Sequence, residues 1–304
     1  MRSAKVLAMR WSAGFVLVLT LALTIVFLAP SALMPALACD AETDGRVLAA
    51  SDFSQVPPQV VEDARNLAEI YYPKDETKAN DMMSQLVGTY LAAADQNFVV
   101  IFNPGGWGWD PVSEIPGWES ILFGIEKTLD DFGYKTLLVD FKRTRHGFNG
   151  IIGELEVLAG IQPAKTKELA ARVTFLTEHL PDLRVILTGE SNGATIADNA
   201  LSLLRGNPRV FAIETGPPVW HPSKEFERSL VIKNNGVQDD TFSNGDIILI
   251  IRSNAESALG IYKGGRGDIL LYIGAPGHYY NWDYPEVRTQ VVDFLTTNFS
   301  PAPK

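Results

Sequence analysis

Between residues 97 and 300, two patterns of hydrophobic and polar positions alternate along the chain. Short, nearly continuous runs of Val, Ile, Leu and Phe predict buried strands, and longer stretches with apolar residues at helical spacing predict amphipathic helices. The predicted strands are Phe98–Phe102, Lys135–Phe141, Arg184–Thr188, Val210–Glu214, Leu230–Lys233 and Asp268–Ile273. The predicted helices are Glu119–Phe132, Lys165–His179, Ala194–Leu204, Gly245–Arg252 and Glu286–Phe299. Continuous apolar strands separated by helices favour an α/β fold with a mostly parallel sheet covered by helices on both faces.

Two more helical patterns, Val60–Tyr72 and Ala79–Ala94, precede the first predicted strand. We interpret them as lead helices that cover the core and take no part in a site. Residues 41–58 are mostly small and polar and end in two prolines, a composition that predicts a linker. The expected domain is therefore 59–304, with residues 59–96 as its helical lead.

The first forty residues differ in composition from the rest of the chain. Basic residues within the first ten positions precede a stretch from Trp11 to Cys39 that has no charged residue, and acidic residues follow it. Basic residues before an apolar stretch and acidic residues after it are typical of an exported chain. We therefore expect residues 1–40 to be a signal peptide or a membrane anchor, which places the domain outside the cytoplasm.

The fate of this N-terminal segment stays open from the sequence. The apolar run Ala13–Ala29 has about the minimum length of a membrane span, which favours an anchor. The tripeptide Ala36-Leu37-Ala38 offers a cleavage site of the A-x-A type, which favours secretion. A lipid-modified Cys39 is a third alternative, although the residues before it fit a bacterial lipobox poorly.

Charge and cysteine content exclude several classes of function. The 26 Lys and Arg residues against 36 Asp and Glu residues give a formal net charge of −10. A surface of this sign does not attract polyanions, so a nucleic-acid partner is not expected. Cys39 is the single cysteine, which excludes an internal disulfide and a cysteine-based metal cluster.

The strongest chemical signal follows the third predicted strand. That strand runs directly into Gly189-Glu190-Ser191-Asn192-Gly193 and then into a helical pattern. A G-x-S-x-G motif between a strand and a helix exposes its serine on a sharp, strained turn, and small neighbours let the backbone pack there. Ser191 is therefore the candidate nucleophile. The pentapeptide also arises by chance, so the alternative is a glycine-rich turn with an ordinary serine.

A serine hydroxyl needs an adjacent base to act as a nucleophile, and this base is usually a histidine. His278 follows the last predicted strand and precedes the last predicted helix, and sites in parallel sheets form at the ends of strands. The other three histidines, His146, His179 and His221, lie in polar loops or at a helix end. His278 is the candidate general base, and a structural loop histidine is the alternative.

The order of these features resembles that of the α/β-hydrolase superfamily over about residues 97–300. The loop around Gly277-His278, followed by a terminal amphipathic helix, is similar to the histidine loop of esterases and lipases. The resemblance implies a catalytic triad in the chain order Ser, Asp or Glu, His. The acid then follows the penultimate strand, where a Gly-x-x-Asp pattern favours Asp239, with Asp240 as the next candidate.

The resemblance also implies two backbone N–H donors for an oxyanion. One belongs to Asn192, the residue after the nucleophile. The other lies in the glycine-rich loop after the first strand, at Gly106 or alternatively at Trp107. This loop is similar to the His-Gly-Gly-Gly motif of the superfamily, but Asn103-Pro104 stands where histidine is usual, which leaves the second donor open.

The resemblance thus implies hydrolysis of carboxylic esters, either lipids or other small molecules, through an acyl-enzyme without a metal or other cofactor. Thioesterase and acyltransferase activities are variants of this chemistry. A lid would come from residues 142–163 or from the lead helices.

The alternative from another class is a catalytically silent hydrolase-fold protein that serves as a binding module of the cell envelope. The aromatic residues that are candidates for an apolar acyl pocket are Trp107, Trp109, Phe148, Tyr279, Tyr280 and Trp282.

Overall fold

The structure is a computed structural model of the chain, and it describes residues 48–106, 108–142, 164–223, 226–265, 267–269 and 273–301. Several predictions from the sequence fall outside these residues and stay predictions. They concern the N-terminal segment 1–40, the aromatic residues Trp107 and Phe148, and most of the predicted lid segment 142–163.

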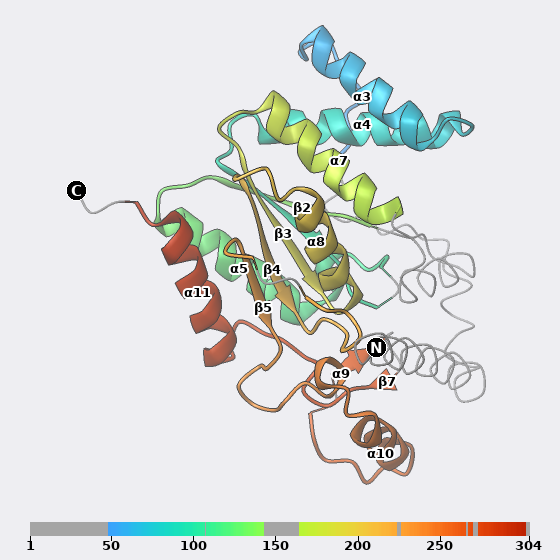
Figure 1. Ribbon diagram of the computed structural model, residues 1–304, viewed down its shortest axis with the longest axis vertical. Helices are drawn as coiled ribbons and strands as arrows, with labels where there is room; N and C mark the ends of the chain where they lie inside the picture. The colour runs from blue at the N-terminus through green and yellow to red at the C-terminus, as the bar shows by residue number, and fades with distance from the viewer. Residues whose placement is uncertain are drawn as a thin grey trace, which may run out of the picture.

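The centre of the fold is a sheet of five parallel strands in the order β2-β1-β3-β4-β5 (Figure 1). These strands are β1 (Phe98–Asn103), β2 (Thr136–Asp140), β3 (Arg184–Glu190), β4 (Val210–Thr215) and β5 (Ser229–Ile232). The chain passes from β1 to β2 on one side and then to β3 on the other, so the strand order reverses between β1 and β3. Ligand sites of such sheets form at this reversal, beyond the carboxyl ends of the strands. The loops after Asn103 and Glu190 meet there.

Helices cover both faces of this sheet. The helices of the described residues are α3 (Pro58–Tyr71), α4 (Glu76–Ala93), α5 (Pro116–Asp131), α7 (Ala164–His179), α8 (Asn192–Leu203), α9 (Thr241–Asn244), α10 (Ile247–Ala258) and α11 (Pro285–Phe299), with a 3₁₀ helix η1 (Val112–Glu114). None of these helices is both long enough and apolar enough to cross a membrane. The predicted parallel sheet with helices on both faces is confirmed.

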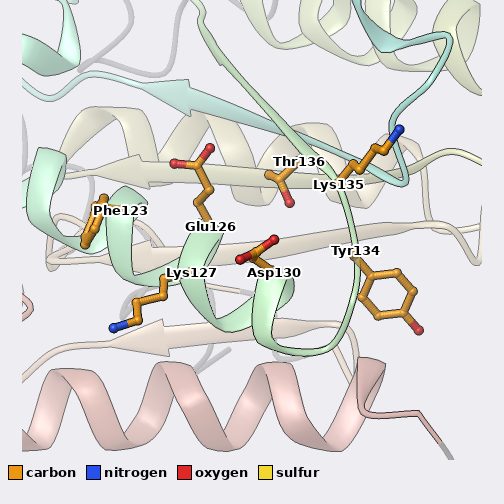
Figure 2. A pocket seen from close by; sticks show the side chains of 7 residues that line it. All are labelled: Phe123, Glu126, Lys127, Asp130, Tyr134, Lys135 and Thr136. Atoms are coloured by element: carbon orange, nitrogen blue, oxygen red, sulfur yellow. The ribbon is translucent and has the colours of Figure 1, made fainter.

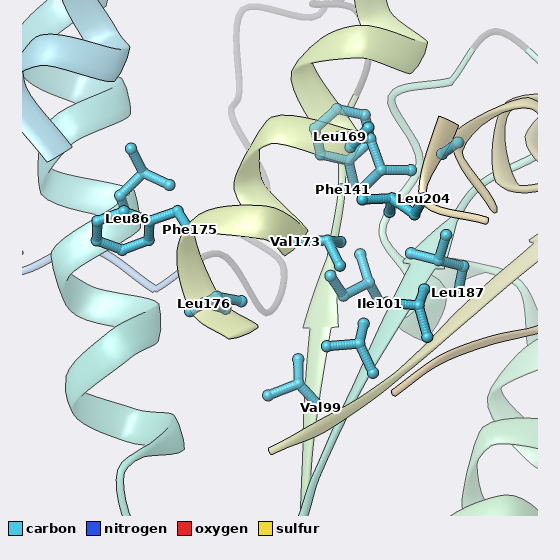
Figure 3. Packing of buried hydrophobic residues seen from close by; sticks show 14 of the residues in the cluster. Leu86, Val99, Ile101, Phe141, Leu169, Val173, Phe175, Leu176, Leu187 and Leu204 are labelled. Atoms are coloured by element: carbon cyan, nitrogen blue, oxygen red, sulfur yellow. The ribbon is translucent and has the colours of Figure 1, made fainter. Parts of the chain in front are cut away.

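One face of the sheet is covered by α7 and α8, and α3 and α4 lie on the outer side of α7 (Figure 1). Val99 and Ile101 of β1 and Leu187 of β3 point to this face, where they join one apolar cluster with Leu169 of α7 (Figure 3). Leu86 of α4 belongs to the same cluster. The lead helices α3 and α4 therefore extend the core on this side.

The opposite face is covered by α5 and α11. Phe98, Val100 and Phe102 of β1 point to this face and pack with Trp118 of α5 and Val291 of α11 in a second apolar cluster. Successive side chains of a strand point to opposite faces. The unbroken apolar run of β1 therefore supplies both layers of the core, as expected for a strand of a sheet that is covered on both sides.

The described residues of the last predicted strand, Asp268–Ile273, are not part of the parallel sheet. In the described residues, β6 (Asp268–Ile269) and β7 (Ile273–Gly274) pair with each other in antiparallel register. The side chain of Asn254 on α10 donates to the carbonyl of Gly274 at 2.7 Å and accepts its N–H at 2.8 Å. These bonds satisfy backbone groups that a neighbouring strand would otherwise satisfy. For these described residues the prediction of a strand of the main sheet is therefore wrong, and α10 rather than the sheet holds the start of the His278 loop.

Candidate active site

Ser191 is a single residue between the end of β3 and the start of α8. Its backbone has φ 56° and ψ −119°, and it is the one residue other than glycine in the described chain that has a positive φ. Such a conformation costs on the order of 1–3 kcal/mol and persists only where surrounding contacts fix it. Here the Ser191 N–H donates to the carbonyl of Thr215 at 2.9 Å, and the Ser191 carbonyl accepts from the N–H of Ala194 at 3.1 Å. The structure thus has the strand, sharp turn and helix that the sequence predicts.

Close backbone packing explains the two glycines that flank this turn. A Cβ at Gly189 would overlap the backbone of Gly193, and a Cβ at Gly193 would overlap the carbonyl of Asn103. The side chain of Asn103 is fully buried, and its Nδ2 donates to the carbonyl of Thr188 at 2.9 Å. Asn103 therefore ties the end of β1 to the end of β3. In the sequence this residue is only a departure from a motif, and its role at the end of β1 becomes visible only in the fold.

His278 and Asp240 form a buried pair. The Nδ1 atom of His278 lies 2.8 Å from Oδ2 of Asp240. The same Oδ2 accepts from the hydroxyl of Tyr280 at 2.7 Å and from the hydroxyl of Ser243 at 3.1 Å. Its Oδ1 caps α9 by accepting the backbone N–H groups of Phe242 at 2.9 Å and Ser243 at 3.1 Å. A carboxylate with this many donors is fixed in the ionised form, and we infer that His278 carries its proton on Nδ1.

Asp239, which the sequence analysis favours as the acid, does not contact His278. Its side chain is exposed, and its Oδ1 accepts from Nδ2 of Asn234 at 2.6 Å. Asn234 and Asp239 also face each other in an isolated antiparallel bridge that closes the turn after β5. This bridge fixes Asp239 at the surface, and the next residue, Asp240, turns inward as the cap of α9. The geometry therefore brings the alternative candidate, Asp240, and not Asp239, into contact with His278.

Each member of the buried pair favours the charged form of the other. Burial alone would lower the pKa of His278, but the Asp240 carboxylate raises it above the usual histidine value. Burial alone would raise the pKa of Asp240, yet the charge and hydrogen bond of His278, with the bonds from Tyr280 and Ser243, lower it. The neutral form of His278, which a general base requires, therefore needs a higher pH than an ordinary histidine does.

The end of β4 brings this pair to the edge where Ser191 stands. Thr215, the last residue of β4, accepts the N–H of Ser191, and the next residue, Gly216, lies against His278. A Cβ at Gly216 would lie 2.6 Å from Cε1 of the His278 ring and 3.0 Å from Oδ2 of Asp240, so this position admits only glycine. The other ring nitrogen of His278, Nε2, is buried and has no hydrogen-bond partner among the described residues. It is therefore available to accept a proton from a hydroxyl group.

The two candidate oxyanion donors, Gly106 and Asn192, lie beside Ser191. Asn192 is the first residue of α8, and the N–H groups of a first helical turn have no acceptor within the helix. Its side-chain Nδ2 lies 3.3 Å from the carbonyl oxygen of Gly106, which places the glycine-rich loop against the start of α8. A Cβ at Gly105 would lie 3.4 Å from the Cβ of Ser191. Trp107, the alternative donor, lies outside the described residues.

Two of the aromatic residues predicted to line an acyl pocket, Tyr280 and Trp282, have other neighbours. Tyr280 is fully buried in the apolar cluster beside α5 and α11, and its hydroxyl is bonded to Asp240. Trp282 packs against α5 so closely that a Cβ at Gly124 would overlap its ring. Trp109 is buried, whereas Tyr279 is 39% exposed. Nothing in the sequence separates these residues, because aromatic side chains serve equally in cores and in pockets.

A second group of buried acidic side chains lies on the α8 side of the sheet. Asp198 of α8 has its Oδ2 2.8 Å from Nε2 of His221, while both carboxyl oxygens of Glu214 on β4 are buried without a hydrogen-bond partner among the described residues. Burial raises the pKa of Glu214 well above its usual value, and the charge of Asp198 adds to this effect. No set of His, Cys, Asp and Glu side chains in the described chain is arranged to hold a metal ion.

We expect Glu214→Gln to raise Tm at pH 8 by roughly 2–4 °C for each kcal/mol of stability gained. Because the folded state raises the pKa of Glu214, the unfolded chain releases this proton more easily. The stability of the wild-type protein therefore falls as the pH rises above about 4.3, and glutamine removes this loss. Calorimetry at pH 8 and near pH 4 measures the difference in Tm between Glu214→Gln and the wild-type protein, which should be larger at pH 8.

Glu168 is the matched control for this prediction. It is also buried, but its carboxylate forms ion pairs at 2.9 Å with both Lys165 and Arg172. Burial alone would raise its pKa, yet these two cations lower it. Glu168→Gln should therefore lower Tm at pH 8, and a Glu214→Gln variant that behaves in the same way would contradict our account of Glu214.

A surface pocket at the other end of the sheet is not part of this site. It lies between α5 and the start of β2 (Figure 2). Because Thr136 is the first residue of β2, the pocket lies at the amino ends of the strands, whereas Ser191 follows the carboxyl end of β3. Its lining mixes charges of both signs with apolar groups. The residues are Phe123, Glu126, Lys127, Asp130, Tyr134, Lys135 and Thr136.

Comparisons with known proteins find similarity only among solved structures. No protein-family model matches the chain, and no curated protein matches its sequence. A Trichoderma reesei cutinase in complex with a C11Y4 phosphonate inhibitor is 14% identical over 80% of this chain and 94% of that chain, with a TM-score of 0.40. A cutinase-like protein from Cryptococcus sp. is 15% identical over 69% of this chain and 98% of that chain, with a TM-score of 0.39. Similarity at this level does not establish a shared activity.

Proposed function

We propose that the protein is a serine hydrolase that cleaves carboxylic esters of lipids or other small molecules through an acyl-enzyme. One observation carries this proposal. A serine held at a strained turn and a buried His278–Asp240 pair occupy the same edge of the sheet, and the free Nε2 of His278 is the acceptor that a serine nucleophile requires. Ser191 is then the nucleophile, His278 the general base and Asp240 the acid that orients it.

In the first half of the proposed reaction, Oγ of Ser191 attacks the acyl carbonyl carbon of the ester and transfers its proton to Nε2 of His278. The carbonyl oxygen becomes negatively charged and accepts the backbone N–H groups of Asn192 and Gly106. Asp240 accepts the Nδ1–H of the imidazolium that forms and stabilises its charge. The imidazolium then gives its proton to the leaving alkoxide, and the alcohol departs.

In the second half, water replaces the alcohol. His278 takes a proton from this water as it attacks the ester bond to Ser191, and the oxyanion forms again beside Asn192 and Gly106. His278 then returns the proton to Oγ of Ser191 as the carboxylic acid leaves. These steps need no metal and no other cofactor. We also propose that residues 1–40 direct the protein out of the cytoplasm.

The assay is the release of p-nitrophenolate from p-nitrophenyl esters of increasing acyl length by the purified full-length protein. An acyl-enzyme predicts a rapid burst that approaches the amount of enzyme, followed by slower turnover. The acyl length that gives the highest kcat/KM identifies the preferred substrate. An added alcohol that accelerates product release identifies the acyltransferase variant. A folded protein that releases no product above the buffer rate from any ester refutes the proposal and favours the silent binding module.

A further inference from the structure

A second carboxyl group, that of Glu190, lies at the same edge of the sheet as the His278–Asp240 pair, because Glu190 pairs with Thr215 of β4 and the next residue, Gly216, lies against His278 and Asp240. Glu190 is the last residue of β3 and directly precedes Ser191. A Cβ at Gly105 would lie 3.4 Å from Oε2 of Glu190 and 3.4 Å from the Cβ of Ser191. The carboxyl group therefore lies against the glycine-rich loop, next to the proposed nucleophile and oxyanion donors.

The charges that act on Glu190 are those of His278 and Asp240. The pKa of Glu190 is raised to about 7: burial raises it most, the charge of His278 lowers it, and the carboxylate of Asp240 raises it. In return, Glu190 contributes to raising the pKa of His278 and that of the Tyr280 hydroxyl. No lysine or arginine of the described chain is among the groups that shift Glu190. His278 is therefore its counter-charge.

We propose that Glu190 is a positioning residue of the hydrolysis: a second carboxylate, besides Asp240, that acts on His278 and favours its imidazolium form. This inference rests on the proposed function, because the imidazolium forms only when His278 takes the proton of Ser191. The motif residue between Gly189 and Ser191 then sets the pH range of the reaction. Glu190 acts on His278 through its charge, whereas Asp240 acts on His278 through both its charge and a hydrogen bond.

The location of Glu190 makes its charge useful at one point of the reaction and costly at another. An ionised Glu190 stabilises the imidazolium in both halves of the reaction. The same charge lies against the loop whose N–H groups hold the oxyanion, where a negative charge is unfavourable. Because Glu190 and His278 interact, their two protons dissociate as a coupled pair, and the acidic limb of the pH profile belongs to the pair.

The test compares Glu190→Gln with Glu190→Asp in the full-length protein, with Glu69→Gln on the exposed surface of α3 as the control. Removing the negative charge lowers the pKa of His278, so the acidic limb of kcat/KM in Glu190→Gln should move to lower pH. Its plateau should fall roughly tenfold as imidazolium stabilisation is lost. Glu190→Asp retains a carboxylate and should keep the limb near that of wild type, and Glu69→Gln should change neither limb nor plateau.

A second measurement does not depend on turnover. The titration of His278, followed by NMR of its imidazole ring in a Ser191→Ala background, should have a lower midpoint when Glu190→Gln is added. An unchanged midpoint and an unchanged acidic limb in Glu190→Gln overturn the proposal. If the wild-type protein has no ester turnover that depends on Ser191, the proposed function fails instead, and the NMR midpoint still decides whether Glu190 acts on His278.

Discussion

Replacing Ser191 with alanine should leave the protein folded and reduce kcat by several orders of magnitude, to the roughly 10³–10⁴-fold acceleration that binding and oxyanion stabilisation alone provide. The reason is the loss of the hydroxyl group at the strained turn between β3 and α8, which lies at the same edge of the sheet as the His278–Asp240 pair. The measurement is steady-state hydrolysis of the preferred p-nitrophenyl ester, with far-UV circular dichroism to verify folding.

Ser191→Gly is the matched control for this variant. It also lacks the hydroxyl, but the φ of 56° at this position lies in the region that favours glycine, so strain is relieved rather than retained. Both variants should be equally inactive, and Ser191→Gly should have a higher Tm than Ser191→Ala. Retention of more than about a tenth of the wild-type kcat in either variant is far above what loss of a nucleophile permits, and it would exclude Ser191 from this role.

Asp240→Asn should lower kcat by roughly 10³ or more. The asparagine oxygen can still cap α9 by accepting the N–H groups of Phe242 and Ser243, so the loop should keep its conformation. An amide group then faces Nδ1 of His278 in place of Oδ2. The ring is forced towards the tautomer that carries its proton on Nε2, which cannot accept the proton of Ser191.

Asp239→Asn is the matched control, because it is the same substitution at the preceding residue. Its carboxylate contacts Asn234 at the surface and not His278, so kcat should fall by less than about tenfold. The pair of variants is compared in the same ester assay as Ser191→Ala. A large loss in Asp239→Asn together with a small loss in Asp240→Asn would contradict the geometry of the buried pair.

The sequence predicts the sheet well because the pattern of its strands is strong. β1, β3 and β4 each contain an unbroken apolar run, which is typical of a strand covered on both faces. The failure at β6 and β7 has a physical cause in the tertiary structure. β7 is held by the side chain of Asn254 on α10, a contact between positions 20 residues apart that no local pattern encodes.

The candidate site could be predicted as far as local backbone geometry determines it. The glycines around Ser191 are required by the packing of the turn, so the motif itself encodes the strained conformation. The choice between Asp239 and Asp240 depends on which residue closes the bridge to Asn234 and which caps α9, and both follow from packing that becomes visible only in the fold. The roles of Asn103 and Tyr280 escape sequence analysis for the same reason.

The most direct test of the central claim, that Ser191 is an activated nucleophile, is reaction of the purified full-length protein with a fluorophosphonate, followed by mass spectrometry of its peptides. Such a probe reacts with serines that an adjacent base activates, and the reaction does not require knowledge of the natural ester. Our account predicts one adduct per chain on the peptide that contains Ser191, its loss in Ser191→Ala, and strongly slowed labelling in Asp240→Asn but not in Asp239→Asn. A folded wild-type protein that remains unlabelled, or an adduct that persists in Ser191→Ala, would contradict it.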